Sequence, residues 1–287
     1  MALAEDGRAP RREPFGPGFV REWVKMRRLA LSIGIALVAG ILAASESEEV
    51  FEKAFSMEGV SRVSVENFNG RVEATTWDRP YLKVQAIKKA TGGSAAQTLK
   101  ETEIRVRKLG NEIRLETVNP NRHRLFGILD FGSGNARVDY KVFLPTSAEL
   151  RLETCNGEVQ ASGTSAPLSC DTVNGAIELN DIGGPIKATT VNGSLRIRFN
   201  GPLKNSRLET VNGSIEVAFD KKSSVAYDLS TVNGRIEGDF ELAVDGKHGP
   251  KEARGQYNGG GASLKCETVN GSIRLRANPE TAAAKPN

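Results

Sequence analysis

Apolar and polar residues alternate in two short runs around an Asn-Gly pair, and this pattern returns six times between residues 152 and 276. In each copy the residues at four and two positions before the asparagine would lie on the same face of a strand, and the residue between them is polar. The alternation resumes after the glycine. A period of two indicates a half-buried β-strand, so each unit is predicted to hold two short strands joined at the Asn-Gly turn. The repeated asparagines are Asn156, Asn174, Asn192, Asn212, Asn233 and Asn270, spaced 18, 18, 20, 21 and 37 residues apart.

The Asn-Gly pairs allow two arrangements of the strands. Asn-Gly is a strong β-hairpin signal. The recurrence of the pattern in one frame instead favours identical units stacked in register about 4.8 Å apart. We therefore predict an all-β fold, a right-handed parallel β-solenoid over residues 146–276. The six asparagines are predicted to form a structural ladder at the turn, where Asn and Gly tolerate positive φ.

The region before the repeats is also strand-like. Residues 45–145 are predicted to be the irregular β beginning of the same domain and to cap the solenoid. Strands are expected at 63–65, 81–86, 103–106, 112–116 and 137–144, with one short helix at 95–100. Residues 277–287 are predicted to be a disordered tail.

An uncharged hydrophobic run at residues 29–44 follows Lys25, Arg27 and Arg28 and is predicted to be helical. It is shorter than the roughly 20 residues that span a bilayer, yet slightly longer than the core of about 7–15 residues typical of signal peptides. A transmembrane anchor and a cleaved signal therefore both stay open, as do Met1 and Met26 as starting residues. Residues 1–28 are predicted to be a disordered basic segment. Either alternative places the protein in the bacterial cell envelope, anchored in the membrane or secreted.

The charge distribution gives no sign of a nucleic-acid partner. Seven of the 39 basic and four of the 35 acidic residues precede Glu46, which leaves 32 basic against 31 acidic residues in the rest of the chain. Their signs are interspersed, without a basic stripe interleaved with aromatics. No nucleic acid is expected as a partner.

The threonines and cysteines of the repeat are interpreted as structural. The threonine two before each asparagine shares the inward parity, so its hydroxyl is expected to bond a neighbouring turn backbone or the next threonine. Cys170 and Cys266 replace aliphatic residues of one column, and Cys155 replaces the valine before the turn. All three are interpreted as small buried hydrophobes and not as a disulfide.

The chain offers little for catalysis. Its two histidines lack partners at metal-ligand spacing, and we predict no enzyme, no cofactor, and no catalytic or metal-binding residues. The alternatives are a polysaccharide-acting β-helix enzyme and a self-associating structural protein of the envelope.

Two loops interrupt the repeat, and binding residues concentrate in such loops on rigid scaffolds. The candidate binding residues are His123, Arg124, Phe126 and Phe131 in the first loop and His248 and Tyr257 in the second.

Several segments together resemble a known family. They are Asn69-Gly-Arg-Val-Glu-Ala, Val138-Asp-Tyr-Lys-Val-Phe-Leu-Pro145, the Thr-Val-Asn-Gly units and Gly259-Gly260-Gly261. Over about residues 60–275 the chain resembles the bacterial putative-adhesin family of β-strand-repeat domains of unknown function. The resemblance implies an exported, membrane-associated β-repeat protein and supplies no catalytic residues. The expected partner is an unknown envelope component, a glycan or a protein, with self-association as an alternative.

Overall fold

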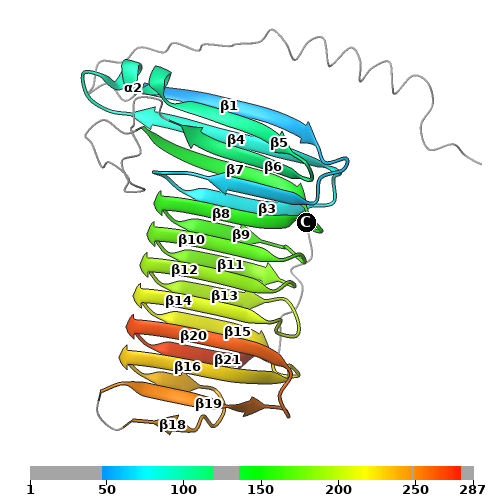
Figure 1. Cartoon of the computed structure of the whole chain (residues 1–287), viewed down its shortest axis with the longest axis vertical. Helices are drawn as coiled ribbons and strands as arrows, with labels where there is room; N and C mark the ends of the chain where they lie inside the picture. Colours follow the sequence, from blue (N-terminus) through cyan, green and yellow to red (C-terminus); the bar gives the residue numbers. More distant parts are fainter. Residues whose placement is uncertain (1–46, 119–135, 247–248, 279–287) are drawn as a thin grey trace, which may run out of the picture. The chain divides into compact units, whose positions relative to one another are not determined.

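Two large β-sheets form the part of the chain that the computed structural model describes, residues 47–118, 136–246 and 249–278. The described residues belong to the second of two units, residues 44–287. Sheet A has the strand order β1-β4-β7-β3-β9-β11-β13-β15-β21-β17, and sheet B has the order β18-β19-β16-β20-β14-β12-β10-β8-β2-β6-β5 (Figure 1). Within these residues no helix has the length and apolar character that a membrane crossing needs. The predicted segments 1–28 and 29–44 lie outside them.

The repeats form rungs that each contribute one strand to sheet B and the next strand to sheet A (Figure 1). The Asn-Gly pair is the corner between the two strands, and equivalent asparagines pair in register, as Asn174 does with Asn156 and Asn192. The rungs in chain order are β8 (Glu149–Asn156) with β9 (Val159–Ser162), β10 (Leu168–Asn174) with β11 (Ile177–Ile182), β12 (Ile186–Asn192) with β13 (Leu195–Phe199), β14 (Ser206–Asn212) with β15 (Ile215–Asp220), β16 (Val225–Asn233) with β17 (Ile236–Gly238), and β20 (Ala262–Asn270) with β21 (Ile273–Asn278).

The region before the repeats adds two further rungs and three antiparallel strands at one end of the same sheets. The rungs are β2 (Arg62–Glu66) with β3 (Val72–Trp77) and β6 (Glu112–Val118) with β7 (Arg137–Pro145). The antiparallel strands are β1 (Ser47–Ser56), β4 (Tyr81–Ala90) and β5 (Glu103–Leu109). The short predicted helix is present as α2 (Ala95–Glu101). At the other end, β18 (Val244–Asp245) and β19 (Lys251–Tyr257) run antiparallel and cover β16.

The order of the rungs in space differs from their order in the chain. The last rung in sequence, β20 with β21, lies between the β14 and β16 rungs. The rung of β2 and β3 likewise lies between the β6 and β8 rungs. This order brings Arg274 between Glu216 and Glu237 on the outer face of sheet A. Stacking in chain order would have placed the two glutamates side by side, and like charges directly opposite each other are destabilising.

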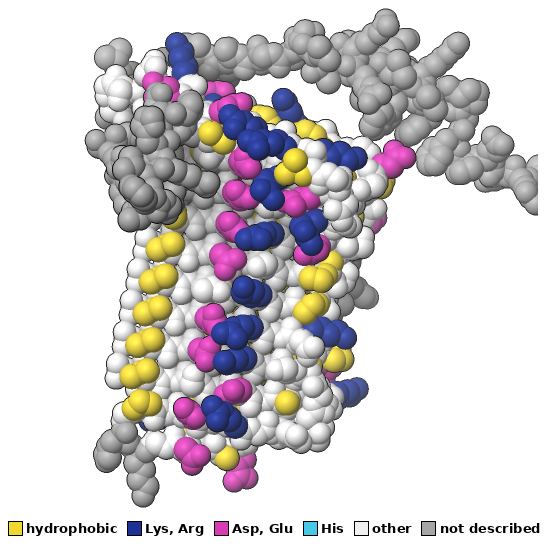
Figure 2. All heavy atoms as spheres, in the orientation of Figure 1, with side chains coloured by type: hydrophobic (Ala, Val, Ile, Leu, Met, Phe, Trp, Pro, Cys, Tyr) yellow, Lys and Arg dark blue, Asp and Glu magenta, His cyan; other side chains and the backbone are white. Residues whose placement is uncertain are grey.

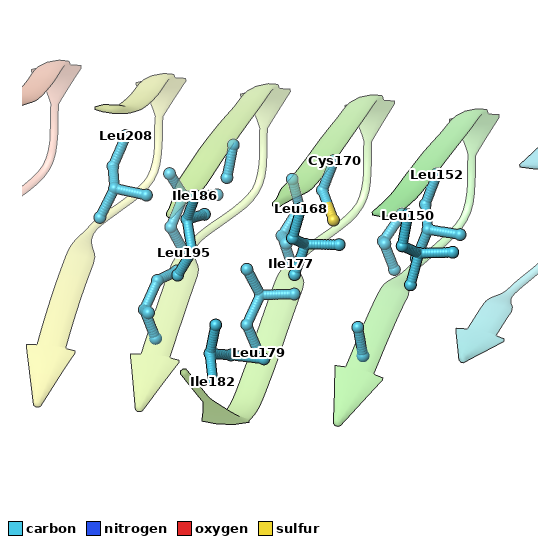
Figure 3. Packing of buried hydrophobic residues seen from close by; sticks show 14 of the residues in the cluster. Leu150, Leu152, Leu168, Cys170, Ile177, Leu179, Ile182, Ile186, Leu195 and Leu208 are labelled. Atoms are coloured by element: carbon cyan, nitrogen blue, oxygen red, sulfur yellow. The ribbon is translucent and has the colours of Figure 1, made fainter. Parts of the chain in front are cut away.

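The core fills the space between the two sheets. Aliphatic side chains from both strands of each rung point into it, and the labelled side chains of Figure 3, such as Leu152, Cys170 and Ile177, are buried with at most 3% exposure. Sheet B contributes Leu208 and sheet A contributes Ile215 from the same rung, both with no exposed surface. The inward parity read from the alternation is thereby confirmed.

The prediction that the Asn-Gly turns use positive φ is wrong for the six repeats. Asn156, Asn174 and the other ladder asparagines have no positive φ, and the glycines that follow them lie outside the left-handed region. The glycine is needed for another reason. A Cβ on Gly193 would lie 1.9 Å from the carbonyl oxygen of Gly175 in the adjacent rung, and the same clash recurs along the corner. Stacking at the spacing of a β-sheet brings one backbone onto the next, so only a residue without a side chain fits.

Candidate functional site

The corner asparagines form a continuous amide ladder on the surface. Each Nδ2 donates to the Oδ1 of the adjacent rung, from Asn174 to Asn156 and from Asn192 to Asn174, both at 2.8 Å. The ladder continues from Asn212 to Asn192 and, in the spatial order of the rungs, from Asn270 to Asn212 and from Asn233 to Asn270. Every interior amide thus both donates and accepts, which leaves its hydrogen-bonding capacity largely used within the ladder.

The buried threonines bind the turn backbone of the adjacent rung. Thr210 donates its hydroxyl to the carbonyl oxygen of Gly193 at 2.8 Å, and Thr190 donates to that of Gly175 at 3.0 Å. The same bond joins Thr154 to Gly70, Thr172 to Gly157, Thr268 to Gly213 and Thr231 to Gly271. These side chains are at most 6% exposed. The glycine carbonyls at the corner are therefore engaged inside the stack.

The valines that precede the asparagines form an exposed apolar line beside the ladder, which we call the valine column (Figure 2). Each valine follows an inward threonine by one residue, so it lies on the outer side of sheet B. The sequence alternation already contains this signal. The column consists of Val173, Val191, Val211, Val269 and Val232 in spatial order, each 38–41% exposed.

Cys155 continues the valine column toward the N-terminal end and is followed there by Phe68. The peptide N–H of Cys155 donates to the carbonyl of Phe68. The expectation that all three cysteines are buried is therefore wrong for Cys155, which is partly exposed, and holds for Cys170 and Cys266. Burial raises the pKa of both of these inner thiols well above its usual range. None of the three cysteines forms a disulfide within the part of the chain that the structure describes.

A cleft of about 700 Å³ lies on the outer face of sheet B at the N-terminal end of the valine column. It crosses β5, β6, β2, β8 and β10, which are neighbours in the sheet. Its size is within the range of about 300–1,000 Å³ typical of ligand pockets. It is lined by Glu66, Asn67, Phe68, Thr102, Arg107, Arg114, Glu116, Thr117, Val118, Ala136, Glu153, Thr154, Cys155, Asp171, Thr172 and Val173.

Carboxylates from four adjacent strands stand in one row along the cleft: Glu116, Glu66, Glu153 and Asp171. Most of them are paired. Arg107 lies 3.1 Å from Glu116, Arg114 lies 3.5 Å from Glu66, and Arg151 pairs with Glu153. The partial burial of Glu66 raises the pKa of its carboxyl, and the neighbouring carboxylates Glu153 and Glu116 act in the same direction.

Asp171 differs from the other three carboxylates. Its nearest polar contact is the hydroxyl of Ser169, 3.5 Å away, and within the described ranges no cation lies at ion-pair distance from it. The row therefore ends in a carboxylate that is open to an external partner. Among the residues described, no group of three or more His, Cys, Asp or Glu side chains is arranged to hold a metal ion.

Of the six candidate binding residues predicted in the loops, only Tyr257 is among the described residues. His123, Arg124, Phe126, Phe131 and His248 lie outside the described residues. Val118 and Ala136, which flank the first loop, both line the cleft.

Tyr257 belongs to the C-terminal end of the stack and not to the cleft. Its ring lies 4.4 Å from that of Phe240 and 6.0 Å from that of Phe219, and its hydroxyl donates to the carbonyl of Lys221 at 3.0 Å. These contacts close the end of the apolar core. The sequence analysis did not predict the cleft. One wall is the β5–β6 hairpin, whose β6 strand carries only a degenerate copy of the repeat in which Pro120 follows the asparagine.

Solved structures that match this chain include three proteins of low sequence identity. A putative cell adhesion protein from Clostridium sporogenes is 14% identical with a TM-score of 0.46, and the match covers 81% of this chain and 99% of that one. A putative adhesin from Bacteroides fragilis is 10% identical with a TM-score of 0.40, covering 80% and 98%. A putative lipid binding protein from Parabacteroides distasonis is 14% identical with a TM-score of 0.35, covering 79% and 96%.

The family assignment rests on the sequence of the β domain. No curated protein matches the chain. The family model described as Toastrack DUF4097, a domain of unknown function, matches residues 64–276, which include all the rungs from the β2 strand to the β21 strand except their outermost residues. The chain belongs to the Toastrack DUF4097 family.

Proposed function

We propose that this protein is an exported, non-enzymatic binding protein of the bacterial envelope, adhesin-like in its role, and that it binds its partner at the cleft on sheet B. The proposal includes the hydrophobic helix at residues 29–44 as the export or anchoring segment and a right-handed path of the rungs. The names of the structural neighbours from Clostridium sporogenes and Bacteroides fragilis agree with an adhesive role.

The observation that best supports the proposal is that the cleft and the valine column form one continuous apolar line on sheet B. Phe68, Cys155 and Val173 line the cleft, and Val191 and Val211 extend the same apolar line along the next two rungs. Beside this line runs the acidic row that ends in the open carboxylate of Asp171. An apolar line with a few polar groups at fixed positions is typical of a recognition surface. The partner expected from this chemistry is a glycan or peptide of the envelope that offers both an apolar stretch and a cationic group.

The test is a binding screen on residues 46–287 against glycan arrays, peptidoglycan fragments and immobilised envelope proteins. For any partner found, Asp171→Asn and Val173→Ser are each expected to weaken binding about tenfold or more, since loss of one well-placed contact is worth about 1–3 kcal/mol. Glu209→Gln is the matched control, because Glu209 occupies the same outward position two rungs further along and outside the cleft. Equal binding by all three variants would place the site elsewhere.

A polysaccharide-acting enzyme is the second candidate, and the carboxylate row favours it. Glycoside hydrolysis uses a pair of carboxyl groups, one of them with a raised pKa that lets it act as the general acid. Glu66 has a raised pKa and stands between Glu116 and Glu153. Release of reducing ends from envelope polysaccharides by the wild type, and its loss in Glu66→Gln, would support an enzyme over a binding protein.

A further inference from the structure

Asparagine followed by glycine is the dipeptide most prone to deamidation, because glycine has no side chain to keep its backbone nitrogen away from the asparagine carbonyl carbon. The chain holds this pair at each of the six repeat corners. Five of the corners share the sequence Thr-Val-Asn-Gly, so their intrinsic reactivity is the same. They are Asn174, Asn192, Asn212, Asn233 and Asn270.

The corners at Asn174, Asn212 and Asn270 are held on both sides by adjacent rungs. At Asn192 the side-chain amide is held on both sides, but among the described residues the N–H of Gly193 donates no hydrogen bond. The N–H of Gly175 donates to the carbonyl oxygen of Asn192, and the N–H of Gly213 donates to that of Asn270, each at 3.1 Å. Asn212 donates its amide to Asn192 and accepts from Asn270. A deamidating glycine nitrogen must lose its proton and approach the side-chain carbon, and both movements break these bonds. A corner held in this way can therefore react only after it opens locally.

Asn233 occupies the last corner of the ladder. Its Nδ2 donates to Asn270, but the next strand, β19, pairs with β16 only as far as Thr231 opposite Lys251. Within the described ranges, no hydrogen bond is donated by the N–H of Gly234 and none is accepted by Oδ1 of Asn233. The bond made by Gly234 is at its carbonyl, which accepts from Lys251. The nitrogen of Gly234 and the side-chain carbonyl oxygen of Asn233 are thus without hydrogen bonds among the described residues, while the backbone carbonyl of Asn233 still accepts from the N–H of Gly271.

We propose that Asn233 is a site of spontaneous deamidation in the folded protein and that the corners at Asn174, Asn212 and Asn270 are protected. The proton of the Gly234 N–H is taken by hydroxide, and the nitrogen attacks Cγ of Asn233. A C–N bond forms, the side-chain nitrogen leaves as ammonia, and a succinimide results. Water then opens the ring to an aspartate or an isoaspartate. The product replaces the amide that donates to Asn270 with a carboxylate, which cannot donate, so the terminal rung loses its ladder bond.

The experiment is peptide mass spectrometry of residues 46–287 after incubation at mildly alkaline pH. Trypsin separates the relevant corners, since Asn192, Asn212, Asn233 and Asn270 fall on different peptides bounded by Lys or Arg. The peptide with Asn233 is expected to convert at least about tenfold faster than those with Asn212 and Asn270, which corresponds to about 1.4 kcal/mol of local opening. Conversion of Asn233 at the rate of Asn212 or more slowly would overturn the proposal.

Unfolded protein provides the internal control. In urea all the Thr-Val-Asn-Gly corners are expected to react at one rate, because their local sequences are the same. If Asn233 stayed the fastest in urea, the difference would come from sequence and the structural account would be wrong. Asn233→Gln is expected to remove the fast conversion while leaving the rates at Asn212 and Asn270 unchanged.

Discussion

The replacement Gly193→Ala tests the close approach of the rungs at their corners. The new Cβ would lie 1.9 Å from the Gly175 oxygen and 2.5 Å from its carbonyl carbon, well inside the 3.0 Å limit that real Cβ atoms respect. The overlap can be relieved only if the two rungs move apart at this corner. That movement lengthens three bonds: from Thr190 to Gly175 at 3.0 Å, from Gly175 to Asn192 at 3.1 Å, and from Asn192 to Asn174 at 2.8 Å.

The magnitude follows from those bonds. Each contributes a net of about 0.5–1.5 kcal/mol, and alanine recovers about 0.4–1 kcal/mol by restricting the unfolded chain. We expect Gly193→Ala to lower the free energy of unfolding by about 1–4 kcal/mol, a range that overlaps the cost of about 1–3 kcal/mol at overpacked sites. The measurement is urea unfolding followed by far-UV circular dichroism.

Gly201→Ala is the matched control. Its Cβ would meet nothing within 4 Å, and its φ lies outside the left-handed region. It should leave the free energy of unfolding unchanged or raise it by up to about 1 kcal/mol. Gly193→Asn distinguishes a steric clash of the Cβ from a requirement for positive φ. Asparagine tolerates positive φ better than alanine does, so it would be the milder substitution only if φ were the cause. Equal stability of Gly193→Ala and the wild type, or a much milder effect of Gly193→Asn, would refute the steric account.

Three further predictions concern the core, the cleft and the thiols. Ile215→Asp should unfold the stack cooperatively because it places a charge in a fully buried position, whereas Glu216→Lys on the outer face should cost at most about 1 kcal/mol; thermal melts that show equal effects would contradict the inward and outward assignment. Since the carboxyl of Glu66 has a raised pKa in the folded protein, its ionisation opposes folding: stability is retained at pH values below its unfolded pKa and falls as pH rises through the folded pKa. Glu66→Gln should therefore raise the urea midpoint at neutral pH and lose this advantage in acid, and a midpoint shift that is independent of pH would argue against this cause. A thiol reagent should label Cys155 in the native protein and reach the other two cysteines only on unfolding, and native labelling of three thiols, counted by mass, would contradict their burial.

Much of the fold could be predicted from the alternation in the repeats. The period of two assigns Leu208 and Thr210 to the inside and Glu209 and Val211 to the outside, and the structure agrees. The short helix before β5 was also predictable, from its position after the Gly92-Gly93-Ser94 break. These features depend on local periodicity, which a sequence displays directly.

The order of the rungs could not be predicted from the apolar pattern. Every rung offers the same inward columns, so any rung can stack on any other at nearly equal cost. The outward charges do distinguish the neighbours: Glu178, Arg196, Glu216, Arg274 and Glu237 alternate in sign only in the spatial order. A prediction that required opposite charges on adjacent rungs would have placed the β20–β21 rung between the β14 and β16 rungs. The cleft gives no comparable signal, because its walls come from strands far apart in the chain.

The inserted rung also determines what the C-terminal residues do. The chain completes β16 and β17, forms the end cap with β18 and β19, and then returns to place β20 and β21 inside the stack. Removing residues 262–278 would therefore not trim the end of the protein. It would leave β14 and β16 without their shared neighbour, so that the terminal rung and its aromatic cap lose their attachment to the rest of the stack. If the two rungs closed the gap instead, Glu216 would lie beside Glu237. Because each rung is stabilised mainly by its neighbours, the loss of this interior rung is expected to cost more stability than the loss of an end rung of the same length.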